Sequence, residues 1–276
     1  MRTLKSRIGS LLYQSREMFL LKWIKLNCPL TRSAVKKISD KQLIYGLNIS
    51  SKYRYVYVGN PKTGGSSLKS AMVELEIRNS NKKLDYHNLK TFRDRNISPL
   101  ERLDELPTNA PLTFLVNNRY KFVTMVRNPY TRLISCYRDK IINNNQQKAG
   151  ILRILGYDHN KLDRHIEFRE FVSAVIGQSD YEMDPHWRVQ TSQVLYGILP
   201  YSFIGRFENY HNDFKGIFRE IGLEESEIPN LRHLHISKSQ TDEGCSTFYS
   251  ADLQDSVYKR YRQDFEVFGY NYELPE

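Results

Sequence analysis

The stretch from Tyr55 to Lys69 constrains the fold of this chain more than any other. It begins with the apolar run Tyr55–Val58, passes through a loop with three glycines, and ends in residues suited to a helix. A strand that leads through a glycine-rich loop into a helix N-terminus is an anion site, because backbone N–H groups converge there and the helix dipole favours negative charge. We therefore predict a phosphate-binding loop.

The position of the lysine separates this loop from the loop of a kinase or nucleotide hydrolase. The P-loop pattern is Gly-x-x-x-x-Gly-Lys-Ser/Thr, and Gly59 and Gly64 have the required spacing. Gly65 takes the place of the lysine, however, and Lys62 lies inside the loop. The next predicted strand leads to Arg127 rather than to an aspartate that would serve magnesium. We predict an anion site without a metal, and a magnesium-dependent kinase or hydrolase is the alternative.

A second anion-binding pattern follows the strand predicted at 121–126. Arg127 stands at the end of this strand, where its planar guanidinium can bind a phosphate in a bidentate manner. Ser135 lies about two turns along the helix predicted at 129–143. In parallel sheets, ligands bind beyond the carboxyl ends of the strands. We therefore expect Arg127, Ser135 and the glycine loop to face the same ligand.

Strands and helices alternate along the rest of the chain, which predicts an α/β fold. More specifically, we expect a P-loop-like, three-layer fold with a central, mostly parallel sheet flanked by helices. Residues 1–50 are predicted to form a basic, helical N-terminal extension, and residues 51–276 the domain itself. The polar segment 143–165 is expected to be a mobile excursion. The remaining predicted elements are strands at 53–58 and 201–205 and helices at 66–77, 98–106, 167–176, 209–221 and 253–268.

Charge and cysteine content limit the classes of function. The net charge of +10 indicates an anionic partner, and by itself it also supports a non-catalytic polyanion-binding protein. The three cysteines contain no Cys-x-x-Cys pair, so a structural zinc site is not expected. Their small, odd number favours a reducing compartment. We therefore predict a cytoplasmic protein.

An apolar segment near the N-terminus bears on membrane association. Residues 18–26 are apolar and aromatic but are interrupted by Lys22 and Lys25. The segment is too short and too charged to span a bilayer, and no small-residue cleavage site follows it. A basic amphipathic helix here either contacts a membrane surface or packs against its own domain. We favour packing and keep peripheral membrane contact as the alternative.

Taken together, the two anion-binding patterns resemble the two nucleotide-binding motifs of the sulfotransferases. The resemblance is strongest to the carbohydrate sulfotransferases, which use 3′-phosphoadenosine 5′-phosphosulfate (PAPS) as the donor and a glycan hydroxyl as the acceptor. One departure is Arg127-Asn128-Pro129 in place of Arg-Asp-Pro. Another is the absence of the cysteines that flank the His-Trp segment in secreted animal members, which fits a cytosolic, bacterial member. The similarity extends over about residues 53–270 and includes Pro61–Ser67, Val126–Ser135, Asp184–Gln190, Tyr201–Glu208 and Tyr258–Tyr270.

The resemblance also implies roles for individual residues. Lys62 would neutralise the charge that develops on the leaving oxygen, while Arg127 and Ser135 would hold the 3′-phosphate. For the general base, His87 and His186 are equally favoured, and an Asp or Glu base is a further alternative. The expected acceptor is a glycan or another sugar-containing molecule, with an acidic one favoured, and no nucleic acid is expected as a partner. The residues assigned to the 5′-phosphosulfate are Lys62, Thr63, Gly64, Gly65, Ser66 and Ser67.

Overall fold

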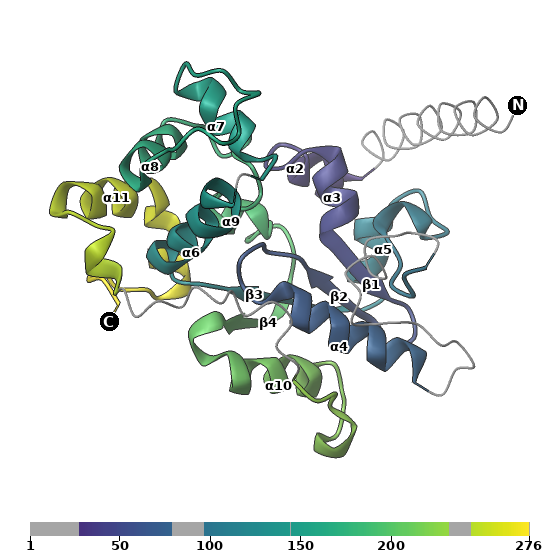
Figure 1. Cartoon of the computed structure of the whole chain (residues 1–276). Helices are drawn as coiled ribbons and strands as arrows, with labels where there is room; N and C mark the ends of the chain where they lie inside the picture. The colour runs from purple at the N-terminus through teal and green to yellow at the C-terminus, as the bar shows by residue number, and fades with distance from the viewer. Residues whose placement is uncertain (1–27, 79–96, 144, 232–243, 276) are drawn as a thin grey trace, which may run out of the picture.

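A four-stranded sheet forms the centre of the protein (Figure 1). The computed structural model describes residues 28–78, 97–143, 145–231 and 244–275. Strand β1 pairs antiparallel with β2, whereas β2, β3 and β4 run parallel to one another. The predicted α/β fold with a mostly parallel sheet is therefore confirmed. The strands, in their order across the sheet, are β1 (Leu47–Ser50), β2 (Tyr55–Val58), β3 (Lys121–Val126) and β4 (Tyr201–Arg206).

Helices cover both faces of this sheet. Tyr55 and Tyr57 of β2 pack on one face against α4 (Gly65–Ile77) and α10 (Tyr210–Glu220). Val56 and Val58 point to the opposite face, where α2 (Pro29–Ala34), α3 (Asp40–Gly46) and α5 (Pro111–Asn117) contribute to the core. Strands buried on both faces are apolar throughout, which explains the unbroken run in β2.

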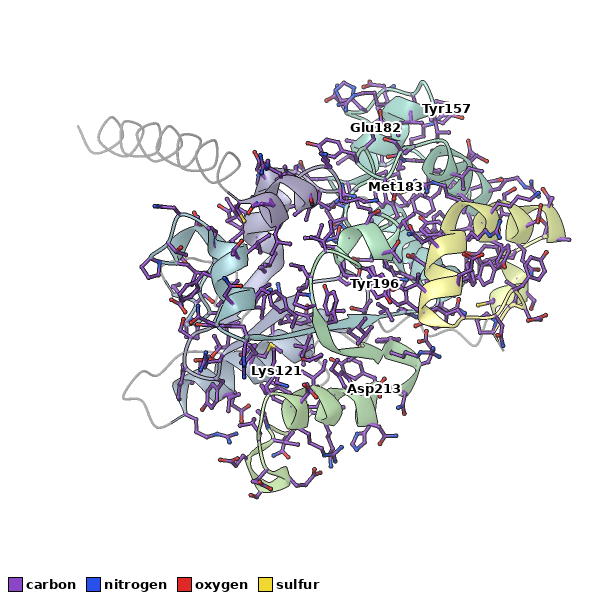
Figure 2. The ribbon with its side chains drawn as sticks, turned by 180° about the vertical axis from the view of Figure 1, so that it is seen from behind. Lys121, Tyr157, Glu182, Met183, Tyr196 and Asp213 are labelled. Atoms are coloured by element: carbon purple, nitrogen blue, oxygen red, sulfur yellow. The ribbon has the colours of Figure 1, made fainter. Side chains whose placement is uncertain are left out.

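A second core lies beside the sheet, among helices that follow β3 in the sequence. It is formed by α6 (Pro129–Cys136), α7 (Lys148–Ile154), α8 (Phe168–Ile176) and α11 (Ala251–Phe268). In Figure 2, Tyr157 and Glu182 lie at the α7 end of the molecule, opposite Asp213 of α10.

The expectation of a mobile excursion at 143–165 is wrong for residues 148–154, because they form α7. Ile151 and Leu152 of that helix are fully buried in the second core. Two adjacent apolar side chains therefore anchor the helix within a polar sequence.

The helix that follows Arg127 changes its geometry part-way along. The α-helical part ends at Cys136, and residues Tyr137–Ile142 continue as a π-helix, η2. The predicted extent to residue 143 is thus nearly correct, but the wider turn was not predicted. Such π-helical turns are rare and are frequent at functional sites.

The structure places the predicted boundary at residue 50 inside the core. A division there would cut the antiparallel pair in which Ser50 of β1 faces Tyr55 of β2. Leu43 and Leu47 are also buried in the core beneath the sheet. We therefore place residues 28–50 with the domain.

Residues 1–27, including the apolar segment at 18–26, lie outside the described residues, so contact of this segment with a membrane stays a prediction. Among the residues that the structure describes, no helix has the length and apolar character needed to cross a bilayer.

Short elements complete the fold. They are η1 (Leu103–Glu105), α9 (Gln190–Gln193), η3 (Phe207–Asn209), η4 (Glu225–Glu227) and η5 (Cys245–Thr247). The predicted helix near 98–106 is therefore a single short turn.

Candidate functional site

The glycine loop between β2 and α4 is held by a tyrosine from another helix. Gly64 has a φ of +76° and forms the N-cap of α4. A Cβ atom at Gly64 would lie 2.4 Å from the ring of Tyr210, whose hydroxyl donates to the Gly64 carbonyl at 2.7 Å. The left-handed backbone and the close ring both require glycine at this position.

The next residue, Gly65, explains why this loop lacks the lysine of a kinase. A Cβ atom at Gly65 would lie 2.9 Å from the hydroxyl oxygen of Tyr57, and Tyr57 is fully buried beneath the loop. A lysine here would have to displace a core side chain. The cationic side chain instead comes from Lys62, whose φ of +70° is also left-handed. The loop geometry therefore accommodates a lysine at position 62 and disfavours one at position 65.

A buried glutamine joins the loop to the end of β3. Oε1 of Gln190 accepts from Nδ2 of Asn60 at 2.9 Å and from the backbone N–H of Arg127 at 3.0 Å. Nε2 of Gln190 donates to the Arg127 carbonyl at 2.7 Å. Asp264 of α11 in turn accepts from the Gln190 N–H at 2.7 Å. These bonds fix the two predicted anion-binding elements relative to each other.

Arg132 strengthens the same connection from within α6. Its guanidinium is buried and donates to the carbonyls of Pro61 at 3.1 Å and Arg188 at 2.7 Å. A further bond goes from the guanidinium to the Pro185 carbonyl at 3.0 Å. The loop and the segment around residue 186 are therefore held against the same helix.

Arg127 lies where the sequence predicts, at the end of β3 and partly buried. Its Nε donates to the Thr131 hydroxyl at 3.0 Å, and its NH1 group donates to the Lys62 carbonyl at 3.3 Å. Its guanidinium also stacks 4.2 Å from the ring centroid of Phe207. Burial lowers the pKa of Arg127, and the nearby Glu208 partly offsets this effect. Arg127 therefore contacts the glycine loop directly, and the ring of Phe207 orients its guanidinium.

Asn128, which departs from the family's Arg-Asp-Pro pattern, keeps a structural role that aspartate could also fill. Its side-chain oxygen accepts from the Tyr130 N–H at 2.9 Å and so caps α6. Asparagine and aspartate are about equally good at N-cap positions. The substitution therefore leaves the start of this helix intact.

The Lys62 side chain pairs with an acidic residue that sequence analysis missed. Its Nζ lies 2.9 Å from Oδ2 of Asp139, in the π-helical turn after α6. Burial alone would raise the pKa of Asp139, but Lys62 and Lys140 hold that pKa below its usual value. The carboxylate is therefore ionised at neutral pH.

His186 also has an acidic partner. Its Nδ1 lies 2.6 Å from Oδ1 of Asp184, which also accepts from the His186 backbone N–H at 2.9 Å. Burial alone would raise the pKa of Asp184, but its bonds with His186 hold that pKa below its usual value. An ionised Asp184 at Nδ1 leaves Nε2 as the ring nitrogen that can accept a proton.

His186 lies beside the helix that carries Ser135. The Cys136 thiol donates to the His186 carbonyl at 2.6 Å, and burial raises the pKa of Cys136 to about 11. Cys136 is therefore a buried thiol with a structural role. Ser135 lies on the same helix and is partly buried. The structure thus brings Lys62, Arg127 and the His186 segment around one helix.

The other predicted site residues lie in the loop or beyond the described residues. Thr63 is fully buried and donates to the Asn60 carbonyl at 2.7 Å, so its hydroxyl stabilises the loop itself. Ser66 and Ser67 occupy the first turn of α4. His87 lies outside the described residues, and its role stays a prediction.

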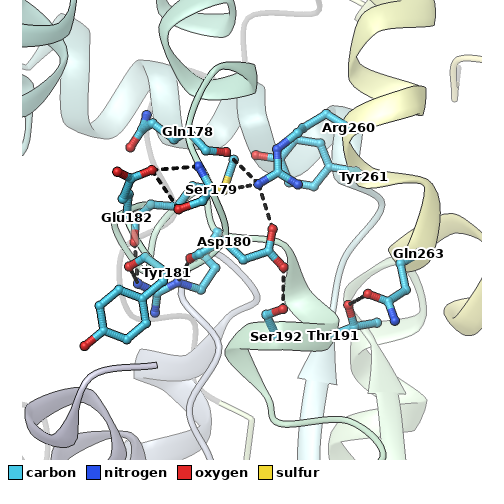
Figure 3. Close-up of polar contacts among 12 residues, drawn as sticks. Gln178, Ser179, Asp180, Tyr181, Glu182, Thr191, Ser192, Arg260, Tyr261 and Gln263 are labelled. Carbon is cyan, nitrogen blue, oxygen red and sulfur yellow. Dashed lines mark hydrogen bonds and ion pairs between the residues drawn. The ribbon is translucent and has the colours of Figure 1, made fainter. Parts of the chain in front are cut away.

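The segment that carries Asp184 and His186 is anchored at both sides. Arg260 of α11 donates to Asp180 at 2.7 Å, and Ser192 donates to the other oxygen of that carboxylate, as Figure 3 shows. Arg188 is buried and donates to the carbonyl of Asp180 at 2.6 Å. His186 therefore lies on a segment whose position is fixed by these hydrogen bonds.

A match to a family model settles the class of the chain. Residues 45–271 match the model described as the sulfotransferase family. The chain belongs to the sulfotransferase family. No solved structure matches the chain.

Curated relatives of this sulfotransferase carry related names. It is 26% identical to human carbohydrate sulfotransferase 9 over 80% of this chain and 52% of that protein. It is 24% identical to carbohydrate sulfotransferase 10 of Xenopus laevis over 97% of this chain and 79% of that protein. With mouse carbohydrate sulfotransferase 8, the identity is 25% over 81% of this chain and 56% of that protein. The chain thus spans about half the length of the first and third of these relatives.

These matches overturn one prediction. The relatives come from human, frog, mouse and zebrafish, and each is a carbohydrate sulfotransferase of a vertebrate. The expectation of a cytoplasmic protein is therefore wrong. It rested on few cysteines and on the absence of flanking cysteines, and neither feature determines a compartment.

Proposed function

We propose that this protein transfers a sulfuryl group from PAPS to a hydroxyl group of a carbohydrate. One observation carries the proposal: Arg127 donates to the carbonyl of Lys62 at 3.3 Å. This contact joins the two anion-binding elements into one surface with a cation from each. Membership of the sulfotransferase family and the names of the relatives support the same reaction.

The donor would lie along this surface. The 5′-phosphosulfate is held by the N–H groups of residues 62–67 at the start of α4 and by the Lys62 ammonium. The 3′-phosphate is held by Arg127 and by the hydroxyl of Ser135. The Gln190 bonds to both Asn60 and Arg127 support this arrangement, because they fix the spacing between the two phosphate positions.

The chemistry requires an in-line displacement at sulfur. The acceptor oxygen forms a bond to sulfur while the bond between sulfur and the 5′-phosphate oxygen breaks. Negative charge then develops on that leaving oxygen, and Lys62 neutralises it. The leaving group is adenosine 3′,5′-bisphosphate.

His186 is our preferred base for the acceptor hydroxyl among the described residues. Asp184 contacts Nδ1 at 2.6 Å, so Nε2 accepts the proton that the hydroxyl loses. His186 then carries a positive charge that the Asp184 carboxylate stabilises. His87 stays the alternative base that the sequence predicts.

The acceptor is a sugar hydroxyl, and the basic character of the chain favours an acidic glycan. A magnesium-dependent kinase or hydrolase is disfavoured at Gly65, because a Cβ atom there would lie 2.9 Å from the hydroxyl oxygen of the buried Tyr57. A non-catalytic polyanion-binding protein would have no need for the bonds that join the two loops.

Transfer of radiolabelled sulfate from PAPS to a panel of glycans tests the proposal. We expect Lys62→Ala and Arg127→Ala each to lower the transfer rate by about 100-fold or more. Lys215→Ala and Arg219→Ala are matched controls, because these cations pair with Glu225 on the surface. Transfer that is unchanged in both site variants would contradict the proposal.

A further inference from the structure

The Lys62 ammonium is shared with an acidic partner at the edge of the donor site. Lys62 Nζ lies 2.9 Å from Oδ2 of Asp139, and Lys140 Nζ lies 3.2 Å from the same oxygen. The side chains of Lys62 and Asp139 are 18% and 38% exposed. Solvent therefore reaches the pair, and its partners can exchange.

The backbones on both sides of this ion pair are fixed. Arg127 donates to the Lys62 carbonyl at 3.3 Å, and the side-chain amide of Asn145 donates to the Asp139 carbonyl. The π-helical turn at 137–142 follows directly after the helix that carries Ser135. Rotation of the Lys62 side chain is therefore enough to change its partner.

A carboxylate at this position competes with the donor. PAPS carries several negative charges, and its phosphosulfate would need the same ammonium that Asp139 now contacts. Asp139 has a second cation on the same oxygen, so it would not be left unpaired if Lys62 moved away. Lys62 can thus leave Asp139 for a bound anion while the carboxylate keeps a cationic partner.

We propose that Asp139 is a positioning residue that holds the Lys62 ammonium while the donor site is empty and releases it to the phosphosulfate on donor binding. Lys140 then stays as the counter-ion of Asp139. This inference rests on the proposed function and adds a step to donor binding. It predicts that the Asp139 carboxylate weakens donor binding through Lys62.

Calorimetric titration with adenosine 3′,5′-bisphosphate tests the inference. We expect Asp139→Asn to bind this nucleotide about twofold to fivefold more tightly than the wild type, because a partly exposed ion pair no longer competes. The KM for PAPS should fall by the same factor, with kcat within about twofold. Asp139→Glu should restore wild-type affinity. A merely structural role for Asp139 would not produce tighter binding.

Two controls separate this effect from the loss of a negative charge in general. Glu225→Gln also removes a carboxylate that pairs with two cations, Lys215 and Arg219, and should leave nucleotide affinity unchanged. In a Lys62→Ala background, Asp139→Asn should give no gain, because the lysine through which it acts is missing.

The outcomes distinguish this inference from the proposed function. If the wild type binds no adenosine 3′,5′-bisphosphate, both are overturned. If the wild type binds it but Asp139→Asn does not bind more tightly, only the inference is overturned. A gain that persists without Lys62 would also overturn it, since Asp139 would then act by direct repulsion.

Discussion

Two regions at helix α6, one around Arg132 and one around Lys62 and Arg127, contain cationic side chains, and they satisfy these charges in different ways. In the bracing region, Arg132 is 1% exposed and donates to three backbone carbonyls and to Asn60. In the second region, which we propose binds the donor and call the donor region, Arg127 donates to the Lys62 carbonyl and to the Thr131 hydroxyl and stacks on Phe207. Among the described residues, Lys62 pairs with the carboxylate of Asp139. The first region uses its donors to hold the backbone, whereas the second keeps cations that a ligand can engage.

The segment from Arg127 to Arg132 therefore serves two purposes: Arg132 holds the backbone, and Arg127 stays available to a ligand. Arg127 and Arg132 are five positions apart in the sequence, and both contact the glycine loop through backbone carbonyls. Replacement of a bracing residue should therefore reduce stability and activity together. Replacement of a donor residue should reduce activity and leave the free energy of unfolding nearly unchanged.

The largest effect on stability is expected from Arg132→Met. The change leaves several buried oxygen atoms without a donor, so the free energy of unfolding should fall by about 3–5 kcal/mol. Urea unfolding followed by circular dichroism measures this change. Arg219→Met is the control, because its pair with Glu225 is exposed to solvent and should contribute little to stability. Equal effects of the two changes would remove the distinction between the regions.

The next largest effect is a loss of sulfate transfer on replacement of His186. Loss of a general base typically lowers the rate by about 100-fold to 10,000-fold, so His186→Ala should reduce sulfate transfer within this range. Asp184→Asn should cause a smaller loss, because the ring remains. His211→Ala, on the exposed surface of α10, is the control. Full activity in His186→Ala would move the role of base to His87 or to a carboxylate.

A change within the glycine loop should moderately reduce both the stability of the protein and its affinity for the nucleotide. Gly64→Ala places a methyl group against Tyr210 and on a left-handed backbone, so we expect a loss of about 1–3 kcal/mol of stability. The affinity for adenosine 3′,5′-bisphosphate should fall as well. Gly150→Ala is a matched control, since a Cβ there meets nothing within 4 Å. A loop that accepts alanine without loss would contradict the proposed role of Tyr210.

The smallest effect is a pH dependence of stability in the bracing region. Asp264 is fully buried, and burial raises its pKa to about 6 despite the N–H groups of Gln190 and Thr191. A raised carboxyl pKa favours the protonated folded state, so this group lowers stability as pH rises from about 4 to about 6. Relative to Asp264→Asn, the wild type should lose about 2 kcal/mol over this interval.

Urea unfolding of the wild type and of Asp264→Asn at several pH values between 4 and 7 measures this difference. The difference between their free energies of unfolding should change with pH below pH 6 and level off above it. A constant difference across the interval would show that Asp264 titrates at its ordinary pKa.

Local patterns predicted the secondary structure around Lys62 and Arg127 well. The strand, loop and helix at 55–77 and the strand end at Arg127 follow from short-range periodicity and from the places where glycine is needed. Each of these signals lies within a few residues of the element that it predicts. The fold class follows as well, because alternating strands and helices require parallel pairing.

The bracing region was not predictable in the same way. Gln190 bonds to Asn60 across 130 positions of the chain, and no local pattern indicates such a pair. One contact of the donor region was missed for the same reason: Asp139, in the π-helical turn, pairs with Lys62 across 77 positions of the chain. Strand β1 was missed since it is four residues long and contains the buried polar side chain of Asn48, which donates to the Tyr57 carbonyl at 3.1 Å.

The central claim is that the two anion-binding elements form one site for a 3′-phosphorylated adenosine nucleotide. Calorimetric titration of the full chain with adenosine 3′,5′-bisphosphate and with ATP, each with EDTA and then with magnesium, tests it most directly. We predict that adenosine 3′,5′-bisphosphate binds at least about tenfold more tightly than ATP, which corresponds to about 1.4 kcal/mol, and that magnesium changes nothing. Tighter binding of ATP that depends on magnesium would contradict the claim.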